Sequence, residues 1–165
     1  MPSASVPDSS PINVLILRLD DQRYGLPLDV VERVIAAVEI TPLPGAPAVV
    51  HGIIDMHGRV VPVMNLRLRL GRPERPNSPD QQFVIVRERP DRLVALVADG
   101  TVGVLEIEPG AAVPGKSVQA NLPLVQGILQ TPEGLIVIHD VSRFLESSDA
   151  AALNRALLEH QAQRA

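Results

Sequence analysis

The chain of 165 residues contains no cysteine and no tryptophan, and its aromatic residues are one tyrosine and two phenylalanines. The absence of cysteine excludes disulfide scaffolds, iron–sulfur clusters, cysteine-ligated zinc and thiol nucleophiles, because each requires a sulfur atom. Apolar residues make up 45% of the sequence and aromatic residues only 2%, so the core must be built mainly from aliphatic side chains. A chain of this length predicts one domain, or two small ones that share a core.

An excess of positive charge and long apolar runs are also missing. The 15 Lys and Arg residues against 19 Asp and Glu residues give a net charge of -4, which argues against electrostatic capture of nucleic acid. No apolar run approaches the roughly 20 residues of a membrane helix. Residues 1–11 lack the basic end and apolar run of a secretory signal. The sequence therefore predicts a cytoplasmic protein with a disordered tail over residues 1–11.

Most apolar residues fall in short β-branched runs separated by turn residues, a pattern typical of strands. For residues 29–37 the pattern predicts a short helical turn that runs into a strand. Paired strands and hairpins are predicted at residues 14–19, 24–28, 49–56, 59–66, 82–87, 93–97, 102–107, 125–130 and 135–139.

Proline marks the middle of the chain, and helical patterns mark its end. Pro73, Pro76 and Pro79 prevent regular structure in residues 71–80, which predicts a linker or an exposed loop. A helical turn is predicted at residues 141–145, followed by a C-terminal helix that Ser148 or Asp149 can cap.

An internal repeat is the most informative feature of the sequence. Gly52 and Asn65 are separated by the same interval as Gly127 and Asp140, and a hairpin with a glycine turn lies between the members of each pair. Two further strand patterns precede each hairpin. The repeat predicts two similar small β-barrels related by a pseudo-twofold axis.

One segment suggests an enzyme. Residues 110–117 read G-x-x-x-x-G-K-S, the spacing of a phosphate-binding loop. Such a loop must open a long helix, but Pro123 follows too soon after Ser117 for one to form. Pro114 also removes one backbone donor. We therefore interpret the segment as a Gly/Pro loop. The alternative hypothesis, a nucleotide-binding enzyme or sensor, can be tested by thermal shift with magnesium nucleotides.

Other catalytic and metal-binding patterns are incomplete. In Asp99-Gly100-Thr101 the glycine and threonine stand in the wrong order for the Asp-Thr-Gly motif of aspartic proteases, and the repeat offers only Asp29 at a comparable place, so both acids are interpreted as turn residues. No histidine has metal-ligand spacing, and all four are interpreted as isolated surface or turn residues. These are His51, His57, His139 and His160. No catalytic residue, metal site or cofactor is predicted.

A basic run in the middle of the chain suggests contact with anions. It consists of Arg67, Arg69, Arg72 and Arg75, with no aromatic residues between them on which bases could stack. We interpret it as a solvated face, or as one half of an interface with an acidic partner. With the catalytic candidates excluded, two barrels with exposed aliphatic patches indicate an interaction module.

Several segments together carry a family resemblance. Residues 17–26 (LRLDDQRYGL), residues 43–47 (LPGAP) and residues 58–67 (GRVVPVMNLR) resemble the CheW domain of bacterial chemosensory arrays in order and spacing. The match continues through residues 94–103, 125–128 and 138–140. It covers about residues 12–146, which leaves residues 147–165 as a C-terminal helical extension.

The resemblance implies a mainly β fold of two five-stranded SH3-like barrels that share a core, and a non-catalytic adaptor. Such an adaptor links the cytoplasmic tip of a methyl-accepting receptor to the regulatory domain of a CheA-type histidine kinase. It meets the membrane only through the receptor. The family's partner-contacting segment falls on Val31, Arg33 and Val34.

Three further residues are predicted to contact partners, namely His57, Arg59 and Arg67. The family usually has Asn-Leu-Arg-Gly at the hairpin turn, whereas residues 55–58 read Asp-Met-His-Gly here, so His57 replaces an arginine. This departure is compatible with a role in a dedicated, non-flagellar pathway, and the C-terminal helix would be a second adaptation to that pathway.

Overall fold

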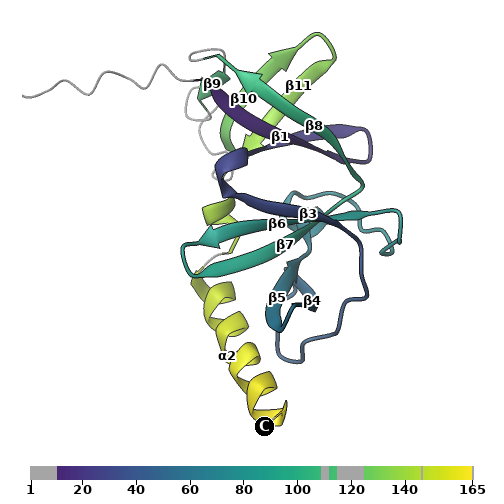
Figure 1. Ribbon diagram of the computed structural model, residues 1–165, viewed down its shortest axis with the longest axis vertical. Helices are drawn as coiled ribbons and strands as arrows, with labels where there is room; N and C mark the ends of the chain where they lie inside the picture. Colours follow the sequence, from purple (N-terminus) through teal and green to yellow (C-terminus); the bar gives the residue numbers. More distant parts are fainter. Residues whose placement is uncertain (1–10, 109–111, 115–124, 146, 165) are drawn as a thin grey trace, which may run out of the picture.

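The computed structural model describes residues 11–108, 112–114, 125–145 and 147–164, which form two β-sheets and a long C-terminal helix (Figure 1). Sheet 1 contains β1 (Ile12–Leu19), β2 (Gln22–Pro27), β8 (Gly100–Ile107), β9 (Ala112–Pro114), β10 (Val125–Thr131) and β11 (Gly134–His139). Sheet 2 contains β3 (Val31–Ala36), β4 (Val50–Met56), β5 (Arg59–Met64), β6 (Gln82–Arg89) and β7 (Arg92–Ala98). The helices are η1 (Leu28–Val30), α1 (Leu66–Arg69), η3 (Val141–Arg143) and α2 (Ser147–Arg164).

The local structure follows the sequence pattern. Each predicted strand overlaps an observed one, and residues 29–37 form the end of η1 followed by β3, as predicted. Residues 71–80 contain neither helix nor strand, which confirms the effect of their prolines. The predicted tail over residues 1–11 lies almost wholly outside the described residues.

The two sheets are topologically equivalent. The strand order is β8-β1-β2-β11-β10-β9 in sheet 1 and β3-β6-β7-β5-β4 in sheet 2. In each sheet an antiparallel hairpin, β1–β2 or β6–β7, pairs in parallel with the second strand of another hairpin, β11 or β5. The β10–β11 pairing shifts register between Val125 and Gly127, and the β4–β5 pairing shifts at the equivalent residues, Val50 and Gly52. This confirms the predicted pseudo-twofold repeat, with β9 as a sixth strand in sheet 1.

Strands are exchanged between the two repeats. Sheet 1 takes β1 and β2 from the first half of the chain and β8 to β11 from the second, whereas sheet 2 takes β3, β4 and β5 from the first half and β6 and β7 from the second. The chain therefore crosses between the sheets after β2 and again after β7. Because of these crossings, residues 71–80 do not separate two independent barrels.

Side chains alternate between two cores along the inner strands. From β1, Leu15, Leu17 and Leu19 enter a large core between the sheets, whereas Val14 and Ile16 enter a smaller core inside sheet 1. Strands buried on both faces appear in sequence as continuous apolar runs, as residues 14–19 do.

The strand β6 repeats this arrangement in sheet 2. Val84 and Val86 belong to the core between the sheets, and Phe83 and Ile85 belong to the core inside sheet 2. A segment after β3 closes the open side of this sheet, because Thr41 pairs with Ile53 of β4. Both sheets thus have an interior of their own and share a third, larger core.

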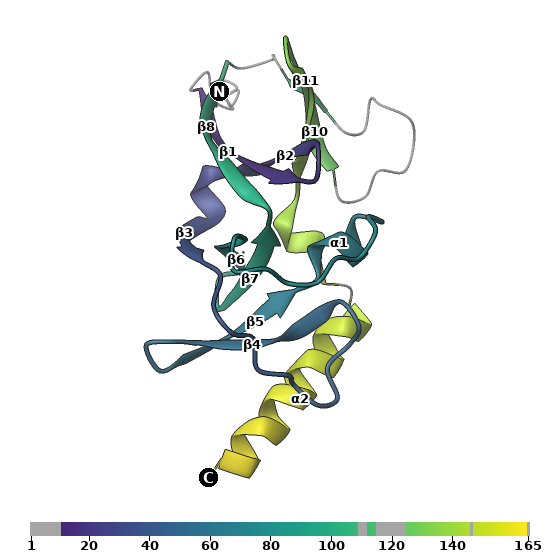
Figure 2. The same ribbon diagram turned by 90° about the vertical axis from the view of Figure 1, so that its right-hand side faces the viewer.

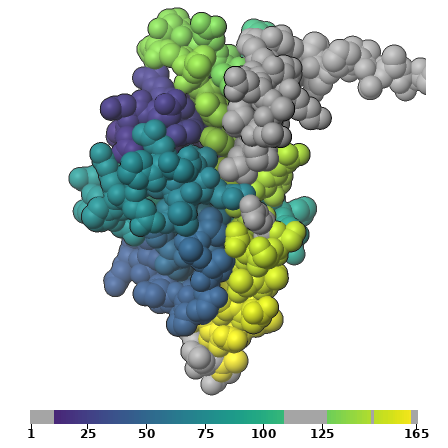
Figure 3. Space-filling model, turned by 180° about the vertical axis from the view of Figure 1, so that it is seen from behind, coloured from purple at the N-terminus to yellow at the C-terminus, as the bar shows by residue number. Residues whose placement is uncertain are grey.

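The helix α2 is part of the shared core. Ala150, Leu153 and Ala156 are buried in it. Figure 3 shows the helix, in yellow, lying along the blue and teal surface that contains sheet 2. Arg92 of β7 donates a hydrogen bond to Asn154 of the helix at 2.7 Å. In the part of the chain that the structure describes, no helix is long and apolar enough to span a membrane.

This packing predicts the cost of shortening one helical side chain. Leu153 is 0% exposed, so Leu153→Ala should lower the free energy of unfolding by about 2 to 5 kcal/mol, through lost burial and the cavity left behind. Urea denaturation followed by circular dichroism measures the change.

Leu158 provides the matched control because it lies on the same helix and is 67% exposed. Leu158→Ala should change the free energy of unfolding by no more than about 0.5 kcal/mol. Equal effects of the two substitutions would show that the helix does not pack as described.

Candidate interaction surface

The first candidate surface is the exposed edge strand β3. Among the described strands it pairs with β6 alone, so it forms an edge of sheet 2. Arg33 is exposed and Val34 is 37% exposed, while Val31 is half-buried and packs against the core between the sheets. The pairing with β6 shifts register between Val31 and Arg33. The strand therefore offers solvent a guanidinium beside an apolar side chain.

The second candidate surface is the tip of the β4–β5 hairpin, which projects from sheet 2 (Figure 2). Both turn residues, His57 and Gly58, have positive φ angles of 55° and 87°, as a two-residue type I′ turn requires. Asp55 accepts a hydrogen bond from the backbone N–H of Gly58 at 2.7 Å, which fixes the turn. His57 and Arg59 are both exposed. Because β3 and β4 are opposite edges of sheet 2, the strand pairing does not bring these two surfaces together.

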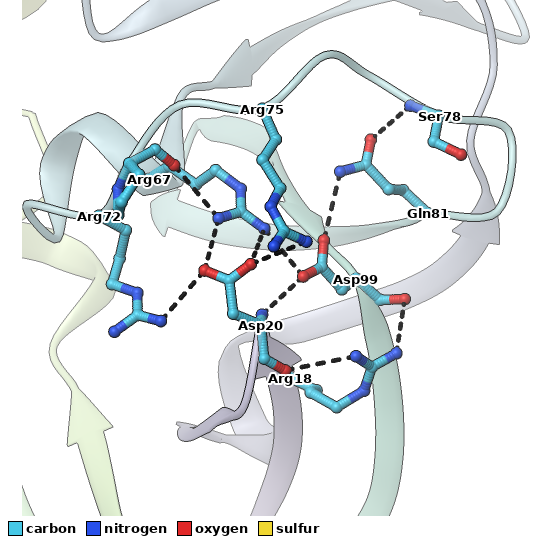
Figure 4. A network of polar contacts seen from close by, with 9 residues as sticks. Arg18, Asp20, Arg67, Arg72, Arg75, Ser78, Gln81 and Asp99 are labelled. Carbon is cyan, nitrogen blue, oxygen red and sulfur yellow. Dashed lines mark hydrogen bonds and ion pairs between the residues drawn. The ribbon is translucent and has the colours of Figure 1, made fainter.

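Arg67 lies inside the molecule (Figure 4). It is 7% exposed and donates from Nη1 and Nη2 to both carboxylate oxygens of Asp20, at 2.8 and 3.1 Å. Nη2 also donates to Asp99 at 2.8 Å, and Nη1 donates to the carbonyl of Pro73 at 3.3 Å. A planar guanidinium can make such forked contacts, whereas an ammonium cannot.

The two aspartates lie in the connections next to which the two sheets come together. Asp20 occupies the β1–β2 turn with a φ of 54°, and its backbone N–H donates to Asp99 at 2.6 Å. Asp99 stands at the crossing from β7 to β8, where its own N–H donates to the carbonyl of Arg18 at 2.8 Å. Arg67 reaches both from the start of α1, directly after sheet 2. Together the three residues join the turn, the crossing and the helix.

The arginines keep both acids ionised. Hydrogen bonds from Arg67, and then from Arg72, hold the pKa of Asp20 well below its usual range although burial opposes this. Burial raises the pKa of Asp99, but the N–H of Asp20 and the guanidinium of Arg67 outweigh it, so its pKa is lowered. The hydrogen bond to Asp20 in turn raises the pKa of Arg67. The cluster is therefore a set of coupled ion pairs.

This geometry corrects the interpretation of the basic run. A solvated face is wrong for Arg67, because its guanidinium is occupied by Asp20 and Asp99. Arg72 and Arg75 also pair with Asp20, at 3.0 and 3.1 Å, and of the two Arg75 is the more exposed. The role of Arg67 as a partner contact stays a prediction, and its observed contacts are internal. No sequence pattern linked Asp20 and Asp99 to it.

His139 also differs from its interpretation as a surface or turn residue, because it is buried. Its ring lies between Tyr24 and Phe144, with centroid distances of 5.2 and 5.9 Å. A half-buried histidine, His51, has its pKa lowered by burial. Because side chains alternate along β11, His139 lies on the face of this strand that is turned toward the shared core. This alternation was the signal for burial available in the sequence.

The G-x-x-x-x-G-K-S segment lies mostly outside the described residues. Within it, Ala112–Pro114 form β9, which pairs antiparallel with β10. A phosphate-binding loop joins a strand to a helix, so strand pairing in its middle argues against that motif.

Taken together, the described residues define a mainly β protein with two equivalent sheets, a shared core and exposed sheet edges. Residues 13–149 match the CheW-like domain family, and the chain therefore belongs to that family. The predicted resemblance is thus confirmed.

Three relatives illustrate the similarity. The chemotaxis protein CheW of Thermotoga maritima is 31% identical over 144 residues, covering 81% of this chain and 87% of the relative. The CheW protein of Klebsiella aerogenes is 23% identical over 148 residues, covering 88% and 89%. Among solved structures, the scaffolding protein TtCheW from Thermoanaerobacter tengcongensis aligns with a TM-score of 0.75 and 28% identity, covering 84% of this chain and 95% of that one.

The ion-pair cluster predicts a large effect of one substitution on stability. Arg67→Met keeps much of the side-chain volume but leaves Asp20 and Asp99 without the guanidinium between them. We expect the free energy of unfolding to fall clearly more than in the control, because two carboxylates lose their shared partner. Arg75→Met is the control: it also removes a partner of Asp20, but Arg75 is 62% exposed, so the loss should stay near 0.5 kcal/mol. Similar losses in both variants would contradict the internal role of Arg67.

The depressed pKa values of Asp20 and Asp99 predict how that loss depends on pH. A carboxylate with a lowered folded-state pKa stabilises the fold above its unfolded pKa of about 4, and this contribution disappears as the pH falls through the folded value. The stability gap between wild type and Arg67→Met should therefore be full at pH 7 and smaller at pH 3. Urea unfolding at both pH values measures it. A gap that stays constant would show that the aspartates are not the source.

Proposed function

We propose that this chain is a non-catalytic chemosensory adaptor that couples the cytoplasmic tip of methyl-accepting receptors to the regulatory domain of a CheA-type histidine kinase. The observation that carries the proposal is the CheW-like domain over residues 13–149. In this role the chain works in the cytoplasm and meets the membrane only through the receptor. Two relatives are named chemotaxis proteins and the structural relative is named a scaffolding protein, and these names support the proposed adaptor role.

The surfaces of the fold suit an adaptor. An adaptor must hold two partners at once, and a rigid scaffold with separate exposed edges can do so without a conformational change. The edge strand β3 and the β4–β5 hairpin tip lie on opposite edges of sheet 2 and carry five of the six predicted contact residues. Edge strands and apolar side chains beside arginine are common features of protein interfaces.

The hairpin tip supports a pathway with its own partners as a finer part of the proposal. His57 is exposed at the tip where the family usually has arginine, so a partner that pairs with that arginine would lose a charged contact here. A receptor or kinase adapted to this chain would instead meet an imidazole and Arg59.

Substitutions on β3 test the adaptor role. Val31 packs against the core, so a charge there would disturb folding as well as binding. Arg33→Glu and Val34→Glu change exposed side chains and should weaken binding of the kinase regulatory domain or the receptor tip at least tenfold, about 1.4 kcal/mol. Isothermal titration with each purified partner measures the affinities, and circular dichroism confirms that the variants are folded.

Leu68→Glu is the matched control, because Leu68 is an exposed apolar residue on α1, on the other side of the molecule from β3 in Figure 2. Its affinity for both partners should remain within twofold of wild type. If folded Arg33→Glu and Val34→Glu variants bind both partners as tightly as this control, β3 is not part of an interface.

A further inference from the structure

The pseudo-twofold repeat creates a second junction equivalent to the one that Arg67 occupies. Asn65 caps α1 by accepting from Leu68 N–H at 3.1 Å, and Asp140 caps η3 by accepting from Ser142 N–H at 3.1 Å. The next residue is buried in both places, Leu66 in one and Val141 in the other. The third residue differs: where the first junction has Arg67, the second has Ser142.

The other parts of the second junction differ as well. The β6–β7 turn contains Pro90 where the β1–β2 turn contains Asp20, so one carboxylate is missing. The crossing from β2 to β3 still carries an acid, Asp29, as the crossing from β7 to β8 carries Asp99. The position equivalent to Arg67 therefore carries no guanidinium.

A pocket of about 300 Å³ opens at this junction. Its apolar walls include Pro27, Pro90 and Val141, and acidic side chains, among them Asp29 and Asp140, line it. At the ion-paired junction the pocket beside Asn65, Leu66 and Arg67 is much smaller, at about 20 Å³. Here the space is open to solvent and lined by both apolar and acidic groups.

Acidic and basic side chains both surround the pocket, and most of them are paired with one another. Arg87 of the lining pairs with Glu32, and Arg89 pairs with Glu88 of the same lining, whose Oε1 lies 3.5 Å from its Nε. Asp140 has Arg143 at 3.4 Å. For Asp29, an exposed residue, the described contacts contain no ion pair. The carboxylate of Asp29 is therefore the acidic group of this lining that a cation from outside would meet.

Glu88 is a second, independent indication. It sits where the β6–β7 pairing shifts register, between Arg87 and Arg89, and such a bulge turns a side chain from its regular direction. Its side chain lines the pocket and is 0% exposed, and its two carboxylate oxygens have only long contacts with arginine, at 3.5 Å to Arg89 and 3.7 Å to Arg92, with no hydrogen bond of normal geometry among the described residues. Burial raises the pKa of Glu88 although Arg92 and Arg89 oppose this. A buried carboxylate without hydrogen bonds is costly unless a donor approaches.

We propose that the pocket between Asp29, Glu88 and Ser142 accepts an arginine side chain from a partner protein, in the way that the equivalent junction holds Arg67. The aliphatic part of the arginine would pack against Pro27, Pro90 and Val141, and its guanidinium would lie near Asp29 and Asp140. The partner is one of those named in the proposed function, and only its identity rests on that proposal.

The pocket itself is tested without any partner. The full ¹⁵N-labelled chain is titrated with N-acetyl-argininamide, and in parallel with N-acetyl-citrullinamide, which has the same shape without the charge. We expect saturable shifts of the amide signals of residues 28–30, 88–89 and 140–143, with at least fivefold tighter binding of the arginine probe. Absent shifts, or equal binding of the two probes, would overturn the proposal.

Three variants locate the binding. Ser142→Arg places a guanidinium in the pocket from within and should abolish binding of the probe, whereas Ser142→Ala leaves the pocket open and should bind within twofold of wild type. Asp29→Asn should weaken binding at least fivefold and keeps the test decisive if Ser142→Arg does not fold. Unchanged binding by folded Asp29→Asn and Ser142→Arg would place the probe elsewhere and refute the site.

The same variants are then measured with the purified receptor tip and kinase regulatory domain. Ser142→Arg should weaken binding of one of them at least tenfold relative to Ser142→Ala. Equal binding of both variants to both partners would refute the docking role even where the arginine probe binds. If the wild-type chain binds neither partner, the proposed function fails, while the probe titration still decides whether the pocket takes arginine.

Discussion

The contact of Arg67 with Asp20 and Asp99 is the interaction on which the arrangement of the two sheets depends. It joins a turn of sheet 1, a helix that follows sheet 2, and the crossing between them. A guanidinium with two carboxylates is costly to bury, but its fixed geometry favours one arrangement over others. Apolar packing alone would tolerate small rotations between the sheets. The forked hydrogen bonds fix the angle at which the sheets, and so their exposed edges, face a partner.

The exchange of strands explains why such a contact is needed at the crossings. Each sheet is completed by strands from the other half of the chain, so neither sheet can form from a continuous segment of sequence. The pairings are therefore non-local, and the shared core forms only when both halves are in place. Leu153 and Ala156 of α2 extend this core beyond the sheets. The shared core thus joins both halves of the chain into one folded unit, and sheet 2 carries β3 and the β4–β5 hairpin at its opposite edges.

The sequence was sufficient for the strands and the repeat, but not for the exchange of strands or the ion-pair cluster. Alternation and turn residues act locally, so they locate β1 or the His57–Gly58 turn without reference to the rest of the chain. Strand exchange does not change the order of the strands along the chain, so the sequence pattern cannot show to which sheet each strand belongs. The arginines near Arg67 in the sequence predict a surface residue, and nothing local indicates that Asp20 and Asp99 converge on it. The spacing of His139 from the other histidines predicts an isolated surface or turn residue, whereas the alternation of β11 indicates burial.

The two junctions show how a symmetric fold acquires different surfaces. Duplicated elements produce the same backbone twice, and the side chains then decide whether each junction is closed or open. One junction holds Arg67 between two acids, and this stabilises the protein whether or not a partner is present. At the other, the short side chain of Ser142 leaves a pocket of about 300 Å³ open, and the buried Glu88 has only long contacts, with Arg89 and Arg92. A junction closed from within serves stability, whereas an open one can gain stability only from outside, and that difference makes the second junction the one suited to recognition.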